Sequence, residues 1–264
     1  MTMWDPDGAG LQPPVLVAGG VFGVAGDTLA SNIAAWNGSA WSPLGSGMNN
    51  SVLALAVLPN GDLAAGGTFT TAGGVAANYI ARWNGTVWTA LGSGMNERVR
   101  ALAVLPNGDL VAAGDFTTAG GAPANRIARW DGSAWSALGS GMNGGVYALA
   151  VQPNGDVAAG GFFTIAGGFA ANRIARWNGT AWSALGSGAS DTVVALEVLP
   201  NGDLVAGGWF FVAGGVATNR IARWNGAAWS ALGSGMNNSV LALAVLPNGD
   251  LAAGGTFTTA GGVA

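Results

Sequence analysis

The sequence predicts an all-β protein, a β-propeller of four-stranded antiparallel blades built from a 47-residue repeat. Two series of tryptophans recur every 47 residues, and the second series lies five residues after the first. A Pro-Asn-Gly-Asp tetrad recurs at the same interval. A meander of four short strands every 40 to 50 residues or so is typical of a propeller blade. The repeated positions are Trp36, Trp83, Trp130, Trp177 and Trp224, then Trp41, Trp88, Trp135, Trp182 and Trp229, and the tetrad prolines Pro59, Pro106, Pro153, Pro200 and Pro247.

The second unit illustrates how each repeat divides into four strands. Its first strand is a continuous apolar run, as expected for a strand that is buried on both faces. Asn60-Gly61 and Asn84-Gly85 are expected to form type I′ hairpin turns, because Asn and Gly tolerate a positive φ. The small residues Ala and Gly in the second strand suit a place where neighbouring blades converge. The expected strands are 52–58, 63–69, 79–83 and 87–91, with a longer loop over 70–77.

Two other repeat architectures fit this pattern less well. A helical solenoid requires a period of 3.6 residues, which no stretch shows, and Gly interrupts every candidate helix. A parallel β-helix has shorter coils and lacks tight antiparallel hairpins. The sequence therefore predicts one propeller domain over residues 1–264, with blades at 1–47, 48–94, 95–141, 142–188 and 189–235 and a surplus half blade at 236–264.

The first blade can be completed in two ways, and the first is slightly favoured. Residues 1–4 can supply its innermost strand, with 5–14 as an enlarged loop. Alternatively, the C-terminal strands can join residues 32–44 and displace the N-terminal copies. Residues 44–76 are identical to residues 232–264, which indicates recent duplication or design. The surplus strands would leave an open edge, through which self-association is possible.

The order of features in each unit is an apolar strand, Gly66-Gly67 at the end of the next strand, Trp83 in the third and Trp88 in the fourth. This order resembles the kelch repeat over nearly the whole chain, although kelch repeats usually have Tyr in the third strand. The resemblance implies a propeller fold. Segments such as Asn-Arg-Ile-Ala-Arg-Trp also resemble repeats of large bacterial surface or secreted proteins, which implies an extracellular or cell-surface location. The first ten residues lack the pattern of a signal peptide.

The composition argues against catalysis and against a cofactor or metal. The chain has no His and no Cys, which removes the commonest general base and the commonest metal ligands. Kelch-like copper oxidases need His and a Cys-linked Tyr, so the resemblance does not extend to that activity. Asp131 opens a turn similar to a sialidase Asp-box, but only Tyr79 and Tyr147 could act as the nucleophile of that class. We therefore expect no enzyme, with a glycoside-acting enzyme as the least favoured alternative.

Two classes of partner are also disfavoured. The formal net charge is −4, and such a chain lacks the basic surface that nucleic-acid binding requires. No apolar run is long enough to span a membrane. The sequence therefore predicts no nucleic acid and no membrane span.

Charged residues recur in pairs within the repeat. An Asp opens the second strand and an Arg lies near the end of the third, so that the two can form a cross-strand ion pair. In the first unit the matching positions are Val15 and Ala35, so both charges are absent together. The expected structural ion pairs are Asp62 with Arg82, Asp109 with Arg129, Asp156 with Arg176, and Asp203 with Arg223.

The repeats differ most in the loops on the side away from the Asn-Gly turns, and loops on a rigid scaffold often carry binding. In two adjacent units apolar residues replace Thr68 and Thr71, and in the second of these units also Thr70, and such a patch often marks a contact. Glu197 replaces an Ala of the innermost strand and is expected to line the central channel. The candidate interaction residues are Phe162, Ile165, Trp209, Phe211, Val212, Glu97, Arg98, Tyr147 and Glu197.

The predicted function is a non-enzymatic scaffold that binds a protein or a glycan on the long-loop face, or that is purely structural. The alternative is a multivalent lectin with one saccharide site per blade, since such repetition suits a repeated ligand. The near-identity of the units favours a structural array, whereas the variable loops favour a binding site.

Overall fold

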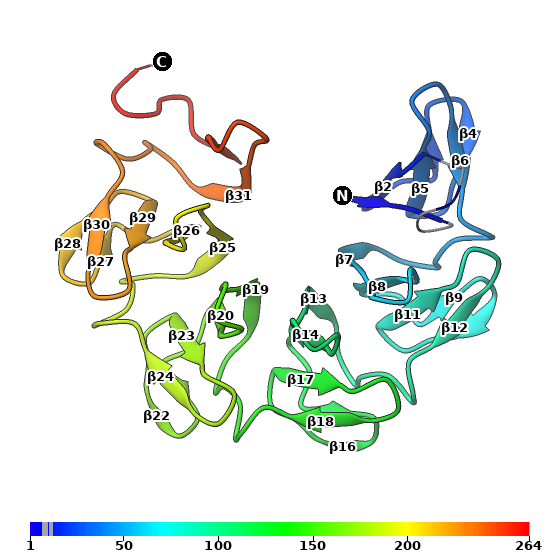
Figure 1. Cartoon of the computed structure of the whole chain (residues 1–264), viewed down its shortest axis with the longest axis horizontal. Coiled ribbons are helices and arrows are strands. Elements are labelled where there is room, and N and C mark those ends of the chain that lie inside the picture. Colours follow the sequence, from blue (N-terminus) through cyan, green and yellow to red (C-terminus); the bar gives the residue numbers. More distant parts are fainter. Residues whose placement is uncertain (7–9, 11–12, 264) are drawn as a thin grey trace. The chain divides into compact units, whose positions relative to one another are not determined.

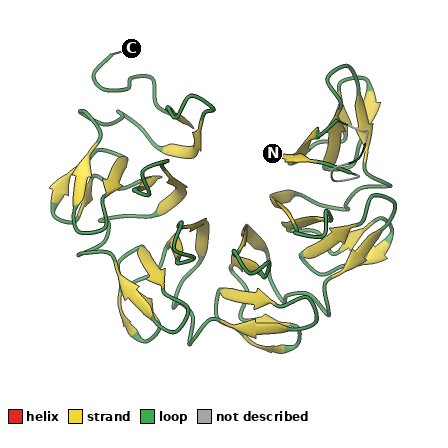
Figure 2. Ribbon diagram, in the orientation of Figure 1, coloured by secondary structure: helices red, strands yellow, loops and turns green. Residues whose placement is uncertain are grey.

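The computed structural model describes residues 1–6, 10 and 13–263, and it forms two compact units, residues 1–138 and 139–264. In the described residues every regular element is a strand, and none is a helix (Figure 2). The all-β prediction is therefore confirmed. The assignment of residues 1–264 to a single domain stays a prediction.

Residues 1–138 contain three four-stranded antiparallel sheets, which we call blades 1, 2 and 3 (Figure 1). The strand order within each sheet follows the chain, as a meander requires. Blade 1 consists of β1 (Thr2–Trp4), β2 (Val15–Gly19), β5 (Ile33–Trp36) and β6 (Trp41–Pro43). Blade 2 consists of β7 (Val52–Val57), β8 (Leu63–Gly67), β11 (Ile80–Trp83) and β12 (Trp88–Ala90), and blade 3 of β13 (Val99–Val104), β14 (Leu110–Gly114), β17 (Ile127–Trp130) and β18 (Trp135–Ala137).

Residues 139–264 contain two more four-stranded sheets and one two-stranded sheet in their described part. Blade 4 consists of β19 (Val146–Val151), β20 (Val157–Gly161), β23 (Ile174–Trp177) and β24 (Trp182–Ala184). Blade 5 consists of β25 (Val193–Val198), β26 (Leu204–Gly208), β29 (Ile221–Trp224) and β30 (Trp229–Ala231), and the half blade of β31 (Val240–Val245) and β32 (Leu251–Gly255). The prediction of five blades and a half-blade repeat is confirmed.

The long loop of each blade is more ordered than the sequence suggested. It folds into a small hairpin of two-residue strands. In blade 2 the turn is Gly73-Gly74, where φ is +59° and +81°, whereas blade 1 has Gly26-Asp27. Strands this short carry too little periodicity to be predicted. The hairpins are β3 (Val24–Ala25) with β4 (Thr28–Leu29), β9 (Thr71–Ala72) with β10 (Val75–Ala76), β15 (Thr118–Ala119) with β16 (Ala122–Pro123), β21 (Ile165–Ala166) with β22 (Phe169–Ala170), and β27 (Val212–Ala213) with β28 (Val216–Ala217).

Blade 1 has the first of the two arrangements that the sequence allowed. Strand β1 pairs with β2 in antiparallel register, with Trp4 opposite Val15, and β2 pairs in turn with β5. The alternative, in which C-terminal strands replace these, does not occur within residues 1–138. Residues 7–9 and 11–12 of the expected loop lie outside the described residues.

The type I′ prediction for the Asn-Gly turns is wrong. A type I′ turn needs a positive φ at both central residues, but only Gly61, at +85°, has one, and Asn60 does not. The Leu58 N–H instead donates to Asp62 O at 2.8 Å across a three-residue loop. Pro59 fixes its own φ near −65°, which suits the first central position of a type I turn. The left-handed Gly61 then closes the loop, as in a three-residue hairpin with a bulge.

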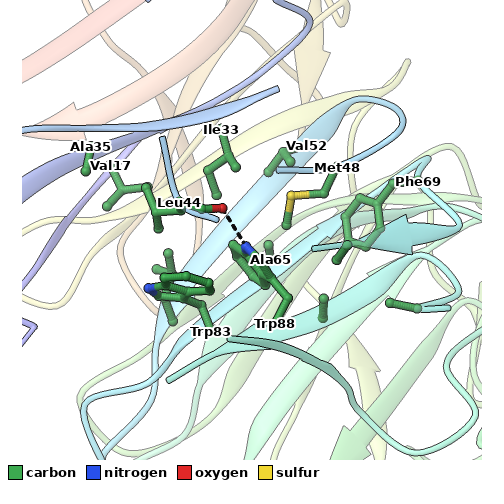
Figure 3. Packing of buried hydrophobic residues seen from close by; sticks show 14 of the residues in the cluster. Val17, Ile33, Ala35, Leu44, Met48, Val52, Ala65, Phe69, Trp83 and Trp88 are labelled. Carbon is green, nitrogen blue, oxygen red and sulfur yellow. Dashed lines mark hydrogen bonds between the residues drawn. The ribbon is translucent and has the colours of Figure 1, made fainter. Parts of the chain in front are cut away.

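The tryptophan series connects neighbouring blades. In residues 1–138, the indole Nε1 of Trp88 donates to Leu44 O at 2.8 Å (Figure 3), and that of Trp135 donates to Leu91 O at 2.9 Å. Trp229 makes the same bond to Leu185 O at 2.8 Å in residues 139–264. Each acceptor lies at the end of the preceding blade. The tryptophans therefore pack between blades, which supports a structural role rather than saccharide stacking.

Small residues in the second strand allow close packing of the blades. Every residue of β8 is buried, and Leu63, Ala64 and Ala65 have no exposed surface. A Cβ placed on Gly66 would lie 2.5 Å from Val99 Cγ1 of blade 3. The second strand of a blade therefore has room only for a backbone or a methyl group where the next blade approaches.

The half blade is less buried than the blades it copies. All five residues of β26 are buried, whereas those of β32 are half-buried or exposed. Within residues 139–263, β32 pairs only with β31, because this copy has no third and fourth strands. Self-association through that edge stays a prediction.

Candidate functional site

In blades 2 to 5 the segment that leads into the first strand is tied to the long loop by hydrogen bonds. In blade 4, Asn143 Oδ1 accepts the N–H groups of Thr164 and Ile165, both at 2.9 Å, and its Nδ2 donates to Thr164 Oγ1. In blade 5, Ser190 Oγ accepts the N–H of Phe211 at 3.2 Å. Segment and loop thus form one defined surface, which we call the loop surface of the blade.

Apolar side chains are exposed on the loop surfaces of blades 4 and 5. Phe162 is 52% exposed, Trp209 45% and Phe211 56%. Together these residues form what we call the apolar loop surface. Its members are Phe162, Ile165 and Phe169 of blade 4 and Trp209, Phe211, Val212 and Val216 of blade 5.

Five of these seven residues were predicted from the sequence, and Phe169 and Val216 were missed. Phe169 is 69% exposed and opens the second strand of the small hairpin. Its signal was available, because the other units have Ala122, Val75 or Val216 at this position and none has an aromatic residue. Nothing in the sequence marked Val216 as unusual, because blade 2 also has a valine, Val75, at the equivalent position.

Two arginines that the sequence analysis did not single out lie beside the aromatic residues. The guanidinium carbon of Arg173 is 4.5 Å from the centre of the Phe162 ring, and that of Arg220 is 3.7 Å from the centre of the Phe211 ring. Both arginines have a left-handed backbone, with φ of +65° and +74°. A guanidinium over an aromatic face is attracted by the ring quadrupole, so each pair is held together.

A hollow of about 280 Å³ lies beside Arg173 on blade 4. Gly144 contributes to its wall, and a Cβ at this position would lie 1.9 Å from Phe162 O. The other units have Asn50, Glu97 or Asp191 at the same place. The hollow is lined by Asn143, Gly144, Phe162, Phe163, Thr164 and Arg173.

Glu97 and Arg98 belong to a charged cluster on blade 3. Asp115 stands where blades 4 and 5 have an aromatic residue, and its carboxylate lies 2.7 Å from Arg98 Nε and 2.8 Å from Arg100 Nε. Glu97 Oε1 is 3.7 Å from Arg98 Nε. The polar loop surface of blade 3 thus supplies its own ionic partners. The joint appearance of Asp115, Arg98 and Arg100 in a single unit was a signal for this cluster.

The remaining two candidates lie on the first strands of their blades, away from the loop hairpins. Tyr147 is on β19. Glu197 is on β25, where it lies directly opposite Val205 of the neighbouring strand β26. Both side chains are half-buried. The structure does not group these two residues with the apolar loop surface, and a channel-lining role for Glu197 stays a prediction.

Glu197→Ala is expected to raise the stability of the folded chain at pH 7. Burial raises the pKa of Glu197, so the fold penalises its charged form, and the penalty is present above the folded pKa. It fades as the pH falls through that pKa to the unfolded value, about 4.3 for Glu. Since the group is half exposed, we expect a gain below about 1 kcal/mol. Urea unfolding of both proteins at pH 7 and pH 4 measures it, and a gain that is equal at the two pH values contradicts the assignment.

The expected ion pairs lie near the Asn-Gly turns. Arg82 Nε is 3.3 Å from Asp62 Oδ2, Arg129 Nη1 is 3.5 Å from Asp109 Oδ2, and Arg176 Nε is 3.5 Å from Asp156 Oδ2. Arg223 also pairs with Asp203. Each arginine is about two-fifths exposed, and a pair of this kind contributes at most about 1 kcal/mol. Their geometry fits a role in fixing strand register.

Asp131 is held in a structural turn. Its carboxylate accepts the N–H groups of Ala134 and Ser133 and the Ser133 hydroxyl. These bonds to the charged form, led by that from Ala134, lower the pKa of Asp131 to about 2. A carboxyl group with such a pKa is ionised at neutral pH and is not available as a general acid.

The described residues show neither a metal cluster nor a spanning helix. No group of three or more acidic side chains gathers as metal ligands would in the part of the chain that the structure describes. In the same residues, no helix has the length and hydrophobicity needed to cross a bilayer.

Comparison with protein-family models shows similarity to a family described as a domain of unknown function (DUF5122) β-propeller, over residues 105–130 and 199–225. These segments make up less than half of the chain. No curated protein matches the sequence.

Several solved structures are similar in fold. The extracellular domain of a one-component system from B. thetaiotaomicron superposes with a TM-score of 0.60 and 12% identity, covering 90% of this chain and 31% of that one. The WD40 β-propeller domain of Doa1 gives 0.56 and 18%, covering 84% and 67%, and a chain of the mitotic checkpoint complex gives 0.56 and 15%, covering 84% and 64%.

The chain spans about a third of the length of the first of these structures. At such low identity the likeness shows the fold alone. Together with the repeated four-stranded sheets and the family match, it shows that the chain is a β-propeller repeat protein.

Proposed function

We propose that the chain is a non-enzymatic repeat scaffold that binds a protein partner through the apolar loop surface of blades 4 and 5. The observation that carries this proposal is the exposure of Phe162, Trp209 and Phe211 at positions where blade 2 has threonines. A contiguous exposed apolar patch on a rigid scaffold is a common mark of a protein interface. Aromatic residues are also enriched at the energetic centres of such interfaces.

The repeat type and the location belong to the same proposal. A kelch-like repeat is supported by Gly66-Gly67 at the end of β8 and by Trp88 in β12. An extracellular or cell-surface position in a bacterium is supported by the similarity to an extracellular domain from B. thetaiotaomicron. The absence of catalysis is supported by the lack of His and Cys.

Replacing five residues of the apolar loop surface by threonine is expected to abolish partner binding without unfolding the chain. Blade 2 carries threonine at all of these positions, so the substituted loops keep a side chain that the repeat already accommodates. The measurement is selection of displayed peptides on the immobilised wild-type chain, followed by binding of the selected peptides to both proteins. The threonine variant is Phe162→Thr, Ile165→Thr, Trp209→Thr, Phe211→Thr and Val212→Thr.

Far-UV circular dichroism of the threonine variant is the control for folding. Peptides that bind the wild-type chain should lose most of their affinity for the variant, because truncation of interface aromatics costs about 2 kcal/mol or more at each hot spot. Selected peptides that bind both proteins equally would place the interface elsewhere.

A multivalent lectin is the second candidate, and a different hollow favours it. This hollow, of about 290 Å³, lies between blades 2 and 3 near the Asn-Gly turns. Its lining combines the Trp130 ring with the polar groups of Arg82, Asp109 and Asp131, and small-molecule sites combine an apolar wall with a few such groups. The parts of this hollow recur with the repeat, as one saccharide site per blade requires. If the wild-type chain binds on a glycan array and the Trp130→Ala variant does not, the result would favour the lectin over the protein scaffold.

A further inference from the structure

We propose that the apolar loop surface selects an acidic partner, an extended peptide whose carboxylates bind Arg173 and Arg220 while its apolar side chains cover the neighbouring rings. This inference rests on the proposed function and names the chemistry of the partner. It stands on the hydrogen bonding of the two guanidinium groups, on their charge environment and on the hollow of blade 4.

Arg173 has unused hydrogen-bonding capacity. Its Nη1 donates to Phe163 O at 3.2 Å, and its ring contact with Phe162 keeps the guanidinium at the surface of the loop. Its Nε is buried and has no hydrogen-bond partner in the described structure. A guanidinium has five N–H groups in a planar fork, and those of Arg173 that a partner can reach are at its Nη atoms, because Nε is buried. A carboxylate is the group that such a fork binds best.

Arg220 is at the equivalent position of blade 5, where it also contacts an aromatic ring and a loop carbonyl, although these belong to different positions of the repeat. Its Nη1 donates to Trp209 O, its guanidinium lies over Phe211, and its Nε is likewise buried without a partner. Arg173 and Arg220 thus give two cationic positions, 47 residues apart, each beside an exposed aromatic ring. An extended segment crossing both blades could place one carboxylate at each position.

The charge environment favours an anion at both positions. Within the described residues, neither Arg173 nor Arg220 has a carboxylate oxygen within 4.0 Å, although arginines elsewhere in the chain do. On blade 5, Asp191, in the segment that leads into the first strand, accepts the N–H and the hydroxyl of Thr192 and so is turned into its own loop. Apolar neighbours lower the local dielectric, which strengthens the attraction between a guanidinium and a carboxylate.

The hollow of blade 4 leaves room for the partner beside Arg173. Asn143 uses its side chain to hold the loop, so the free donors at the hollow are those of Arg173. Gly144 and Gly145 replace the side chains that the other units carry at the entry to the blade. Blade 3 shows the contrast, since Asp115 already occupies its loop surface and binds Arg98 and Arg100.

The test uses three fluorescein-labelled eight-residue peptides that share two Phe residues and differ only in carrying Glu, Gln or Lys at three other positions. Fluorescence anisotropy measures the binding of each to the full chain. We expect the Glu peptide to bind at least about tenfold tighter than the Gln peptide, a difference of about 1.4 kcal/mol or more, because it can form charge-assisted pairs with both arginines. The advantage should shrink as salt is raised, because exposed charges are screened.

Two sets of variants locate the effect. Arg173→Asn with Arg220→Asn should reduce the Glu peptide to the affinity of the Gln peptide and leave the Gln peptide unchanged. Asn32 occupies the same left-handed position in blade 1, with φ of +65°, so Asn suits this backbone. Arg126→Asn makes the identical change on blade 3 and should alter neither affinity.

The outcomes separate this inference from the proposed function. Equal binding of the Glu and Gln peptides, with both lost in the threonine variant, would overturn the acidic preference and support the docking surface. Tighter binding of the Lys peptide would also overturn it. Binding of none of the three peptides would count against the acidic preference and the docking surface together.

Discussion

Trp88→Ala is expected to lower the free energy of unfolding by about 3 to 5 kcal/mol, the usual cost of removing a buried Trp. The Trp88 ring is 4% exposed and lies 5.2 Å from the ring of Trp83. Its Nε1 also supplies the hydrogen bond to Leu44 O that joins blade 2 to blade 1. The substitution therefore opens a cavity between blades and removes one of the two hydrogen bonds that Leu44 O accepts, the other coming from the Gly47 N–H at 3.3 Å. Urea unfolding followed by far-UV circular dichroism measures the loss.

Two comparisons divide that cost into its parts. Trp88→Phe keeps most of the ring and removes the donor, so its loss should be smaller, about 0.5 to 1.5 kcal/mol, the net contribution of one hydrogen bond. Trp41→Ala makes the same change at the corresponding position of blade 1, where the ring is only half-buried, and should cost less. A Trp88→Ala loss no larger than that of Trp41→Ala would contradict the interblade role.

The architecture could be predicted because it depends on features that every unit repeats. Trp88, Pro59 and Gly66 each recur at a fixed spacing. The residues that form the turns and the ends of the strands could therefore be identified independently in several units. The turn type was missed because Asn60 was assumed to share the left-handed conformation of Gly61. The Pro before it already favoured a type I turn.

The candidate site was only partly predictable, because its chemistry depends on side-chain placement. The exposure of Phe162 and Trp209 could be predicted, because both stand at a loop position where blade 2 has a threonine. The partnership of Arg173 with Phe162 did not, since the two residues are eleven apart and meet only through the small hairpin between them. Arg126 and Arg173 occupy equivalent positions of the repeat, so the sequence alone gave no reason to expect different contacts for the two side chains. Only the neighbouring residue, Asp115 or Phe162, makes the two loop surfaces different.

Gly66→Val is expected to destabilise the chain by about 1 to 3 kcal/mol, the usual cost of overpacking a core. The added Cβ would lie 2.5 Å from Val99 Cγ1 and 3.0 Å from Val99 Cβ, so β8 and β13 would have to separate. Gly66→Ala should be milder, because Ala113 occupies the equivalent position of blade 3.

The decisive measurement for Gly66 is a double-mutant cycle with Val99→Ala. Shortening Val99 removes the methyl groups that the new side chain would meet, so the double variant should be more stable than the sum of the single changes predicts. We expect a coupling energy of about 1 kcal/mol or more, within the range for residues in contact. Simple additivity would show that the Gly66 substitution acts within its own strand. Coupling would show that small residues in the second strand set the spacing of neighbouring blades, and with it the positions of the loop surfaces that those blades carry.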